Sequence, residues 1–373
     1  MGIFCRTILF TLTNMCWIHP SFSQWVEISN VRTNRLLTEL GGPVIEISFE
    51  LNVPDASMDM PVYVFMRATM DQGSTWMLVD PAFLQGDGFG IISNPGKKRV
   101  LWWGSRETGA ENPELYIKGI RMARIPAGKF VMKSFPAGGK DPFIKERPDT
   151  NLSEFYMAIN ETTIGMYADY LNETDGSGWH ERMSNERRCG IFQLDSAGKR
   201  TYKVIPARDN YPITYVSWYD ATAFLHWCGL RLPSEAMFEK AFVGGIYLDG
   251  DQTKSNKNPI PERKFPWGNE DPDQGGIYRC NFDGYEDGFS NLSPVGTFLD
   301  FPSPYGINDL AGNVAEWTID WYTTTYHVGL DGFRMLRGGS WLATPVECDA
   351  VSGATQFPIK ESSIMGFRGV TVK

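Results

Sequence analysis

Oxygen-bearing side chains gather in one short glycine-containing stretch, residues 281–289, with the sequence NFDGYEDGF. Carboxylate and carbonyl oxygens are the ligands that a hard cation such as calcium prefers, in sets of about six to eight. The same composition is typical of a tight turn whose carboxylates stay solvated. The stretch therefore predicts a calcium-binding loop, with the solvated turn as the alternative.

Thiols are the second group of side chains that could take part in catalysis or metal binding. Beyond the apolar N-terminal segment the chain has four cysteines: Cys189, Cys228, Cys280 and Cys348. None of them forms a CxxC pair, so a zinc site is not supported. Four cysteines allow three disulfide pairings, and the sequence cannot choose among them. Cys348 is either a reactive thiol or a structural residue, and we favour the structural interpretation.

Other catalytic patterns are missing from the sequence. The four histidines are scattered, and there is no HExxH, no GxSxG and no phosphate-binding loop. The net charge is −9 and no run of Lys or Arg occurs, so nucleic acid is not an expected partner. The tryptophans at 102–103, 317 and 321 could stack on sugars, although such residues belong more often to a core.

The elements that position these residues fall into two parts. A chain of 373 residues is long enough for two domains. Its 12 Trp, 38 Gly and 23 Pro indicate a loop-rich fold that contains β-structure, not a helical bundle.

The N-terminus has the pattern of a signal peptide. Arg6 precedes a mostly apolar stretch over residues 7–18, and Ser21 and Ser23 are small residues before a cut at Gln24. We expect residues 1–23 to be removed and the protein to be secreted, periplasmic or on the cell surface. A buried N-terminal segment is the alternative. No later apolar run is long enough to cross a bilayer.

Residues 24–121 are expected to form an all-β module. Alternating or apolar runs occur at 44–51, 63–67, 98–103 and 115–120, separated by clusters of turn-forming residues. Short strands at this spacing favour a β-sandwich. The layout resembles small immunoglobulin-like or fibronectin-like modules, which implies an adhesion or spacer role.

Three short helices are expected in the second part. Apolar residues between Ile164 and Leu171 recur at helical spacing. Ser217, with Asp220 three residues later, predicts a capping box before an apolar stripe that ends at Cys228. Ser234 is expected to cap the third helix.

A series of motifs across residues 122–373 resembles the formylglycine-generating enzyme, or sulfatase-modifying factor, family. They include RLPSEA (231–236), FPWG (265–268), YGINDLAGNVAEW (305–317), RGGSW (337–341) and GFR (366–368), in the family's order. The resemblance implies an α+β, C-type-lectin-like fold with much irregular structure, behind the β-sandwich.

The resemblance also implies two calcium sites. The first would use the side chains of Asn281 and Asp287 with the carbonyls of Phe282 and Phe289. The second would use the side chains of Asp309 and Glu316 with the carbonyls of Gly312 and Val314. These oxygen donors suit calcium, which we expect as the cofactor.

The family's redox site is incomplete in this sequence. Family enzymes bind copper(I) between two cysteines in a GGS(Y/W)xC….C segment, because soft thiolates suit that ion. Here Ala343 stands at the first cysteine position and only Cys348 matches the second, with Ser340 in the same segment. Ala315 also replaces an aromatic residue of the family motif. Cys348 and Ser340 are the candidate catalytic residues, and copper is not expected.

Together these features favour a non-catalytic binding or structural protein outside the cytoplasm, with a protein or carbohydrate ligand and a possible homo- or hetero-oligomeric assembly. An atypical oxidoreductase of the same family is the alternative. A carbohydrate-binding role beside an exported hydrolase is the third hypothesis.

Overall fold

The computed structural model describes residues 25–38, 42–71, 73–103, 113–133, 150–196, 198–322 and 332–372. The predicted signal peptide, residues 1–23, lies outside them. No helix in these described ranges has the length and apolar character needed to span a membrane.

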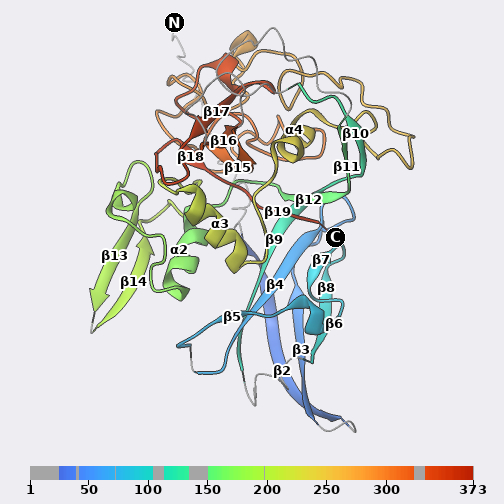
Figure 1. The fold of residues 1–373 in the computed structure, drawn as a ribbon, viewed down its shortest axis with the longest axis vertical. Coiled ribbons are helices and arrows are strands. Elements are labelled where there is room, and N and C mark those ends of the chain that lie inside the picture. Colours follow the sequence, from blue (N-terminus) through green and yellow to red (C-terminus); the bar gives the residue numbers. More distant parts are fainter. Residues whose placement is uncertain are drawn as a thin grey trace, which may run out of the picture.

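Two sheets form the N-terminal half (Figure 1). One is four-stranded, in the order β2 (Ile28–Thr38), β3 (Gly42–Leu51), β8 (Gly96–Trp102) and β6 (Leu84–Gly86). The second contains β4 (Val62–Thr69), β5 (Met77–Leu78), β9 (Glu114–Ile125), β1 (Trp25–Val26) and β7 (Gly90–Ile92). The turn η1 (Pro81–Phe83) precedes β6.

Side chains from both sheets share one apolar cluster, including Ile47 and Val100 from the first and Val64 and Met66 from the second. The expected strand runs are therefore present, because period-two alternation turns one face of each strand inward. Trp102 belongs to this core, so it is not a surface for stacking on sugars.

The long strand β9 belongs to both halves of the chain. Its residues Glu114 to Arg121 pair with β4, whereas Met122 to Ile125 pair with β12 (Phe155–Ala158). The predicted boundary between residues 121 and 122 is therefore a change of partner within one continuous strand. β19 (Val370–Val372) pairs with the other edge of β12, so one sheet runs through both halves (Figure 1).

The C-terminal half is a mixture of short helices, small sheets and long loops. Its helices are α2 (Ile164–Glu173), α3 (Trp218–Trp227) and α4 (Glu235–Val243), with the short turns η2 (Glu181–Ser184), η3 (Gln274–Gly276) and η4 (Pro345–Cys348). Its four-stranded sheet has the order β17 (Gly353–Gln356), β16 (Arg334–Arg337), β15 (Ala315–Trp321) and β18 (Met365–Gly366). Two ribbons join β10 (Gly128–Phe130) to β11 (Thr150–Leu152) and β13 (Ile191–Ser196) to β14 (Lys199–Val204).

The helix starts follow from local sequence. Ser217 and Asp220 form the predicted capping box at α3, and the Ser234 side chain accepts a hydrogen bond from the Met237 N–H at α4. These side chains satisfy backbone donors that have no partner within the helix. Gly244 ends α4 with φ of +85°, a conformation that glycine adopts without steric cost.

An aromatic interface joins the two halves. Phe65 of β4 packs edge-on against Trp227 of α3, with ring centroids 5.4 Å apart. Arg67 of β4 donates to the Trp227 carbonyl at 2.9 Å and forms a buried ion pair with Glu173 of α2. Since buried aromatic side chains contribute large apolar areas, this contact fixes the N-terminal sheets against the helices.

Candidate functional site

The segment with the two candidate catalytic residues folds as a tight turn. Thr344 and Glu347 form a capping box in which both the Thr344 N–H and hydroxyl donate to the Glu347 carboxylate at 2.8 Å. These bonds lower the pKa of Glu347. Ala343 donates its N–H to the Ser340 carbonyl at 2.9 Å, so residues 340–348 form a compact double turn.

Cys348 and Ser340 both lie inside the protein. Cys348 is 0% exposed and Ser340 is 4% exposed. The Ser340 hydroxyl accepts a hydrogen bond from the Leu342 N–H at 3.3 Å. A Cβ at Gly339 would lie 2.8 Å from the Cys348 sulfur, so only glycine allows this approach. Neither candidate residue therefore faces an open cleft.

Cys280 is the neighbour of Cys348, and the sequence pattern does not predict this contact. The two thiols lie close enough to interact and belong to the same apolar cluster, which also contacts Ala343. Burial raises the pKa of the Cys280 thiol well above its usual value, and the contact with Cys348 raises it further. A sulfur partner for Cys348 thus comes from a segment 68 positions earlier (348 − 280). No spacing motif signals this pairing.

The carboxylates of the second predicted calcium site, Asp309 and Glu316, belong to a buried acidic cluster. Arg368 forms a bidentate ion pair with Glu316, while Asp309 accepts from the Gly296 N–H. Glu161 lies close enough for the charges of Asp309 and Glu316 to raise its pKa, after burial, which is the larger cause. Three carboxylates thus surround one guanidinium. Burial also raises the pKa of Asp309, to about 6.

This cluster has an excess of negative charge that a cation would offset. The Glu161 Oε1 atom is buried without a hydrogen-bond partner, which fits a cation nearby. Both Glu316 oxygens already accept from Arg368, so Glu316 has only its remaining lone pairs to offer. No group of three or more His, Cys, Asp or Glu side chains among the described residues is arranged to hold a metal ion by itself. Calcium binding at this second site would therefore also require the backbone carbonyls of Gly312 and Val314.

The first predicted calcium set forms a closed loop. Asp287 accepts hydrogen bonds from the N–H groups of Phe282 at 3.2 Å and Phe289 at 2.9 Å. Burial raises the pKa of Asp287 despite these bonds. The Asn281 amide nitrogen donates to the Asn291 carbonyl, but its Oδ1 atom is buried and has no partner. This unpartnered oxygen could serve as a cation ligand, and the donor set is one that calcium accepts.

The Asn313 side chain connects the two predicted calcium sites. Its Oδ1 accepts from Asn281 Nδ2 at 3.1 Å and from the Ser293 N–H at 3.0 Å, and its Nδ2 donates to Glu161 Oε2 at 3.0 Å. Its φ of +59° is tolerated by asparagine. Asn313 and Arg368 lie within the family motifs, but the sequence assigns no role to their side chains or to Glu161, because their partners are far away along the chain.

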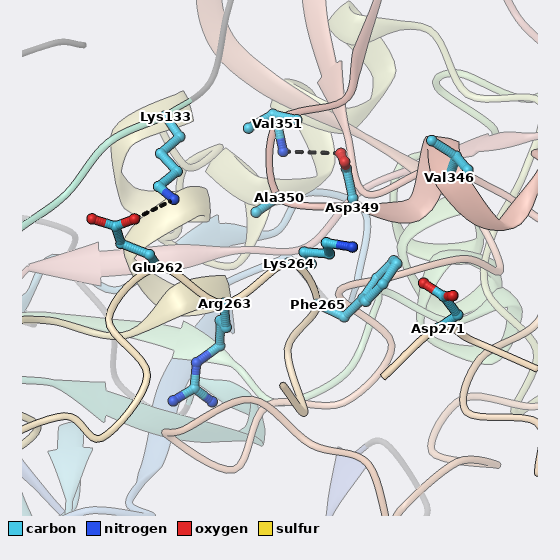
Figure 2. Close-up of a pocket in the computed structure, with 10 residues that line it drawn as sticks. All are labelled: Lys133, Glu262, Arg263, Lys264, Phe265, Asp271, Val346, Asp349, Ala350 and Val351. Carbon is cyan, nitrogen blue, oxygen red and sulfur yellow. Dashed lines mark hydrogen bonds and ion pairs between the residues drawn. The ribbon is translucent and has the colours of Figure 1, made fainter. Parts of the chain in front are cut away.

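A cavity of about 300 Å³ lies on the outer side of η4 (Figure 2). Lys133 and Glu262 form an ion pair of 2.9 Å at one end, and the Ala350 N–H donates to the Lys264 carbonyl at 2.7 Å across it. The turn contributes Val346 from within η4 and Asp349, which directly follows Cys348. Cys348 itself is not among the lining residues, so its thiol lies behind the wall of the cavity.

An exposed aromatic surface surrounds Arg334 of β16. The guanidinium of Arg334 lies between the rings of Trp218 and Trp321, 3.8 Å and 3.3 Å from their centroids. Trp321 and Phe357 are each about half exposed, and Tyr219 stands beside Trp218. We call these five residues the aromatic face. Trp317, by contrast, is fully buried and belongs to the core.

Comparison with known proteins agrees with the motifs. The model of the sulfatase-modifying factor enzyme 1-like domain matches residues 110–373, and the chain belongs to this family. It is 28% identical over 299 residues to a formylglycine-generating enzyme of Streptomyces coelicolor, which covers 66% of this chain and 87% of that protein.

A second relative is named for the loss of that activity. The chain is 39% identical over 252 residues to the inactive C-alpha-formylglycine-generating enzyme 2 of Mus musculus, which covers 60% of this chain and 75% of that protein. Among solved structures, Treponema denticola variable protein 1 aligns with a TM-score of 0.46 at 21% identity, covering 68% of this chain and 95% of that one.

Proposed function

We propose that this protein is a non-catalytic binding protein that uses a sulfatase-modifying-factor-like domain as a scaffold outside the cytoplasm. The observation that carries the proposal is the loss of one thiol and the burial of the other in the segment 338–348. Ala343 stands where the resemblance places a metal-binding thiol, and Cys348 is fully buried. A substrate cysteine cannot reach a thiol that is closed in by packing on all sides.

The family relatives support this proposal. One relative at 39% identity is named as inactive, so loss of catalysis on this scaffold has a precedent. The buried ion pair of Arg368 and Glu316 and the capped helices persist here without the cysteine pair. A scaffold that keeps its supporting contacts while the reacting groups are missing fits a binding role.

The aromatic face is the surface that we assign to the ligand. Trp, Tyr and Arg are the residue types that contribute most binding energy in protein interfaces. Here Trp321, Tyr219 and Arg334 lie together, and Ile359 next to Phe357 is three-quarters exposed. An exposed apolar surface rimmed by polar residues is typical of an interaction site. We infer a protein partner, with a carbohydrate as the alternative.

The N-terminal β-module would present this domain within an assembly. Its two packed sheets agree with an immunoglobulin-like or fibronectin-like spacer, and the shared strand β9 would transmit a fixed orientation. The predicted signal peptide supports export.

Calcium would act in this protein as a structural cofactor. Asn281 and Asp287 would supply side-chain oxygens, with carbonyls from Phe282 and Phe289, and Asp309 and Glu316 would contribute at the second set with Gly312 and Val314. The bound cation would neutralise buried carboxylate charge and hold the loops that pack around Asn313.

The experiment that tests the absence of catalysis measures copper(I) binding and oxygen consumption with a CxPxR peptide as substrate. We expect no stoichiometric copper binding and no peptide turnover. A formylglycine-generating enzyme with both cysteines serves as the positive control. Stoichiometric copper together with peptide oxidation would overturn the non-catalytic assignment.

An atypical oxidoreductase is the second candidate, because Cys280 brings a second sulfur beside Cys348. Two neighbouring thiols can in principle carry redox chemistry. Their complete burial weighs against turnover of a macromolecular substrate. In the copper and oxygen assay, loss of the signal in both Cys280→Ala and Cys348→Ala would support this candidate.

A further inference from the structure

We propose that Cys280 and Cys348 form an intramolecular disulfide bond in the native protein. Each is a buried free thiol in the structure, and the two side chains contact each other within one apolar cluster. This inference goes beyond the proposed binding function and does not depend on it.

Backbone hydrogen bonds hold the two cysteine-bearing segments in place. The Asn281 carbonyl accepts from the Asn313 N–H at 2.8 Å, and the Gly338 carbonyl accepts from the Gly312 N–H at 2.8 Å. The Asp283 N–H donates to the Ala343 carbonyl at 2.8 Å. The segments at 280–283 and 338–348 therefore lie side by side through the loop at 312–313, and they keep the two thiols together without a bond between the sulfurs.

Two glycines allow the segments that carry the cysteines to pack closely. A Cβ at Gly312 would lie 2.2 Å from the Asn281 carbonyl oxygen, and one at Gly339 would lie 2.8 Å from the Cys348 sulfur. Real Cβ atoms do not approach so closely, so these glycines let the backbone of residue 281 and the thiol of Cys348 pack tightly. The pair is thus positioned by the surrounding chain.

Of the four cysteines, the structure brings Cys280 and Cys348 together and places the other two elsewhere. The Cys228 sulfur donates to the Leu225 carbonyl at 3.3 Å within its own helix. Cys189 lies in the other apolar cluster, with residues of α2 and β13. Burial raises the pKa of its thiol, while contacts with the backbone at Ile191 and Thr214 oppose this shift. Cys189 and Cys228 are therefore internal controls that we expect to stay reduced.

The oxidant is an external disulfide, such as oxidised glutathione or a dithiol oxidoreductase. The deprotonated thiol of Cys348 attacks one external sulfur, which forms a mixed disulfide and releases one external thiolate. The deprotonated thiol of Cys280 then attacks the Cys348 sulfur and releases the second thiolate. The two cysteines lose two electrons, the external disulfide gains them, and the two protons end on the released thiols.

Burial determines when this exchange takes place. The thiolate is the attacking species, and it must meet the external disulfide directly to react. An external disulfide has no path to Cys280 and Cys348 in the folded protein, because these residues are 3% and 0% exposed. The folded reduced protein should therefore oxidise slowly, whereas a chain that folds in the presence of the oxidant should oxidise before the core closes.

The test is peptide mapping of the full-length protein refolded with oxidised and reduced glutathione. The sample is denatured, alkylated, reduced and labelled with a second reagent, so that each cysteine reports its state by mass. We expect Cys280 and Cys348 to carry only the second label and to appear as one cross-linked peptide without reduction. Cys189 and Cys228 should carry the first label.

Variants give a second measurement. Reduction should lower the thermal midpoint of the wild type and of Cys189→Ser and Cys228→Ser, but not that of the double variant Cys280→Ala/Cys348→Ala. First-label alkylation of both Cys280 and Cys348 in the refolded wild type would overturn the proposal, as would a cross-link from either residue to Cys189 or Cys228. The mapping uses the wild type, so it does not depend on the folding of any variant, and it is independent of the copper assay.

Discussion

Arg368 donates three hydrogen bonds to Glu316 at the buried centre of the C-terminal half, at 2.9, 2.8 and 2.7 Å. Both side chains are almost completely inaccessible to solvent. Arg368 also donates to the carbonyls of Ala158, Ile159 and Asp309, so one guanidinium connects β12, the Asp309 loop and β15. Glu161 and Asp309 add two further carboxylates nearby, which makes Arg368 the cation of a mainly acidic cluster.

We expect Arg368→Met to lower the free energy of unfolding by about 3–5 kcal/mol, because it leaves buried carboxylates without their cation. Arg200→Met is the matched control, since its ion pair with Asp175 is largely exposed and is worth about 1 kcal/mol or less. Urea denaturation in the presence of a chelator measures both. Equal losses in the two variants would contradict the role given to Arg368.

The interface between the halves predicts a single cooperative unfolding transition. Arg67 joins β4 to Glu173 and to the Trp227 carbonyl, and its side chain is buried. Arg67→Met should cost about 3 kcal/mol, whereas Arg99→Met, which removes an exposed pair with Glu46, should change the stability much less. Tryptophan fluorescence during thermal unfolding reports both halves. Two separate transitions in the wild type would contradict this coupling.

The stability of the protein should depend on pH through Lys240 of α4. Its ammonium group donates to the carbonyls of Pro126 and Gly128, and burial lowers its pKa from 10.5 to about 8. Between these two pH values the unfolded chain binds more protons than the folded protein, so stability rises as pH increases. This contribution is complete above pH 10.5 and is lost as pH falls through about 8.

Lys240→Met should remove this part of the pH dependence. The difference in unfolding free energy between the wild type and Lys240→Met is measured by urea denaturation across the alkaline range. Lys199→Met, at an exposed position in β14, should give a curve parallel to that of the wild type. A parallel curve for Lys240→Met would show that Lys240 is not the source.

Calcium should raise the thermal midpoint of the wild type, because a ligand that binds only the folded state stabilises it. Asp287→Asn should lose most of this increment, since it removes a carboxylate from the first set. Asp273→Asn, an exposed position in the preceding loop, should retain it. Differential scanning calorimetry with and without a chelator measures the shift. An unchanged wild-type midpoint would exclude the proposed cation.

The aromatic face should account for most of the affinity for a protein partner. Trp321→Ala is expected to weaken capture of that partner from an envelope extract by at least tenfold, because central aromatic residues are worth about 2 kcal/mol or more in interfaces. Tyr285→Ala is the control, since Tyr285 is the most exposed large apolar residue of the described chain and lies outside this face.

Quantitative mass spectrometry of the captured proteins gives the result, and a glycan array tests the carbohydrate alternative. Equal capture by the wild type, Trp321→Ala and Tyr285→Ala would remove the aromatic face from the binding role. Glycan binding that Trp321→Ala abolishes would replace the protein partner with a carbohydrate.

Much of the architecture was predictable because it depends on neighbouring residues. The capping box of Ser217 and Asp220 spans four positions, and the alternating strand β3 needs only its own residues to define a buried face. The order of the motifs identified the family, and Ala343 is visible in the sequence at the position of the first cysteine.

The tertiary structure alone decided which distant groups meet. Strand β9 continues across the predicted boundary, because its two ends find different partners, β4 and β12, that its own pattern does not specify. Cys280 lies beside Cys348, and Asn313 connects Asn281 with Glu161, through irregular loops that have no periodicity. Sequence patterns report on contacts a few residues apart, whereas these contacts depend on how long loops pack around a common core.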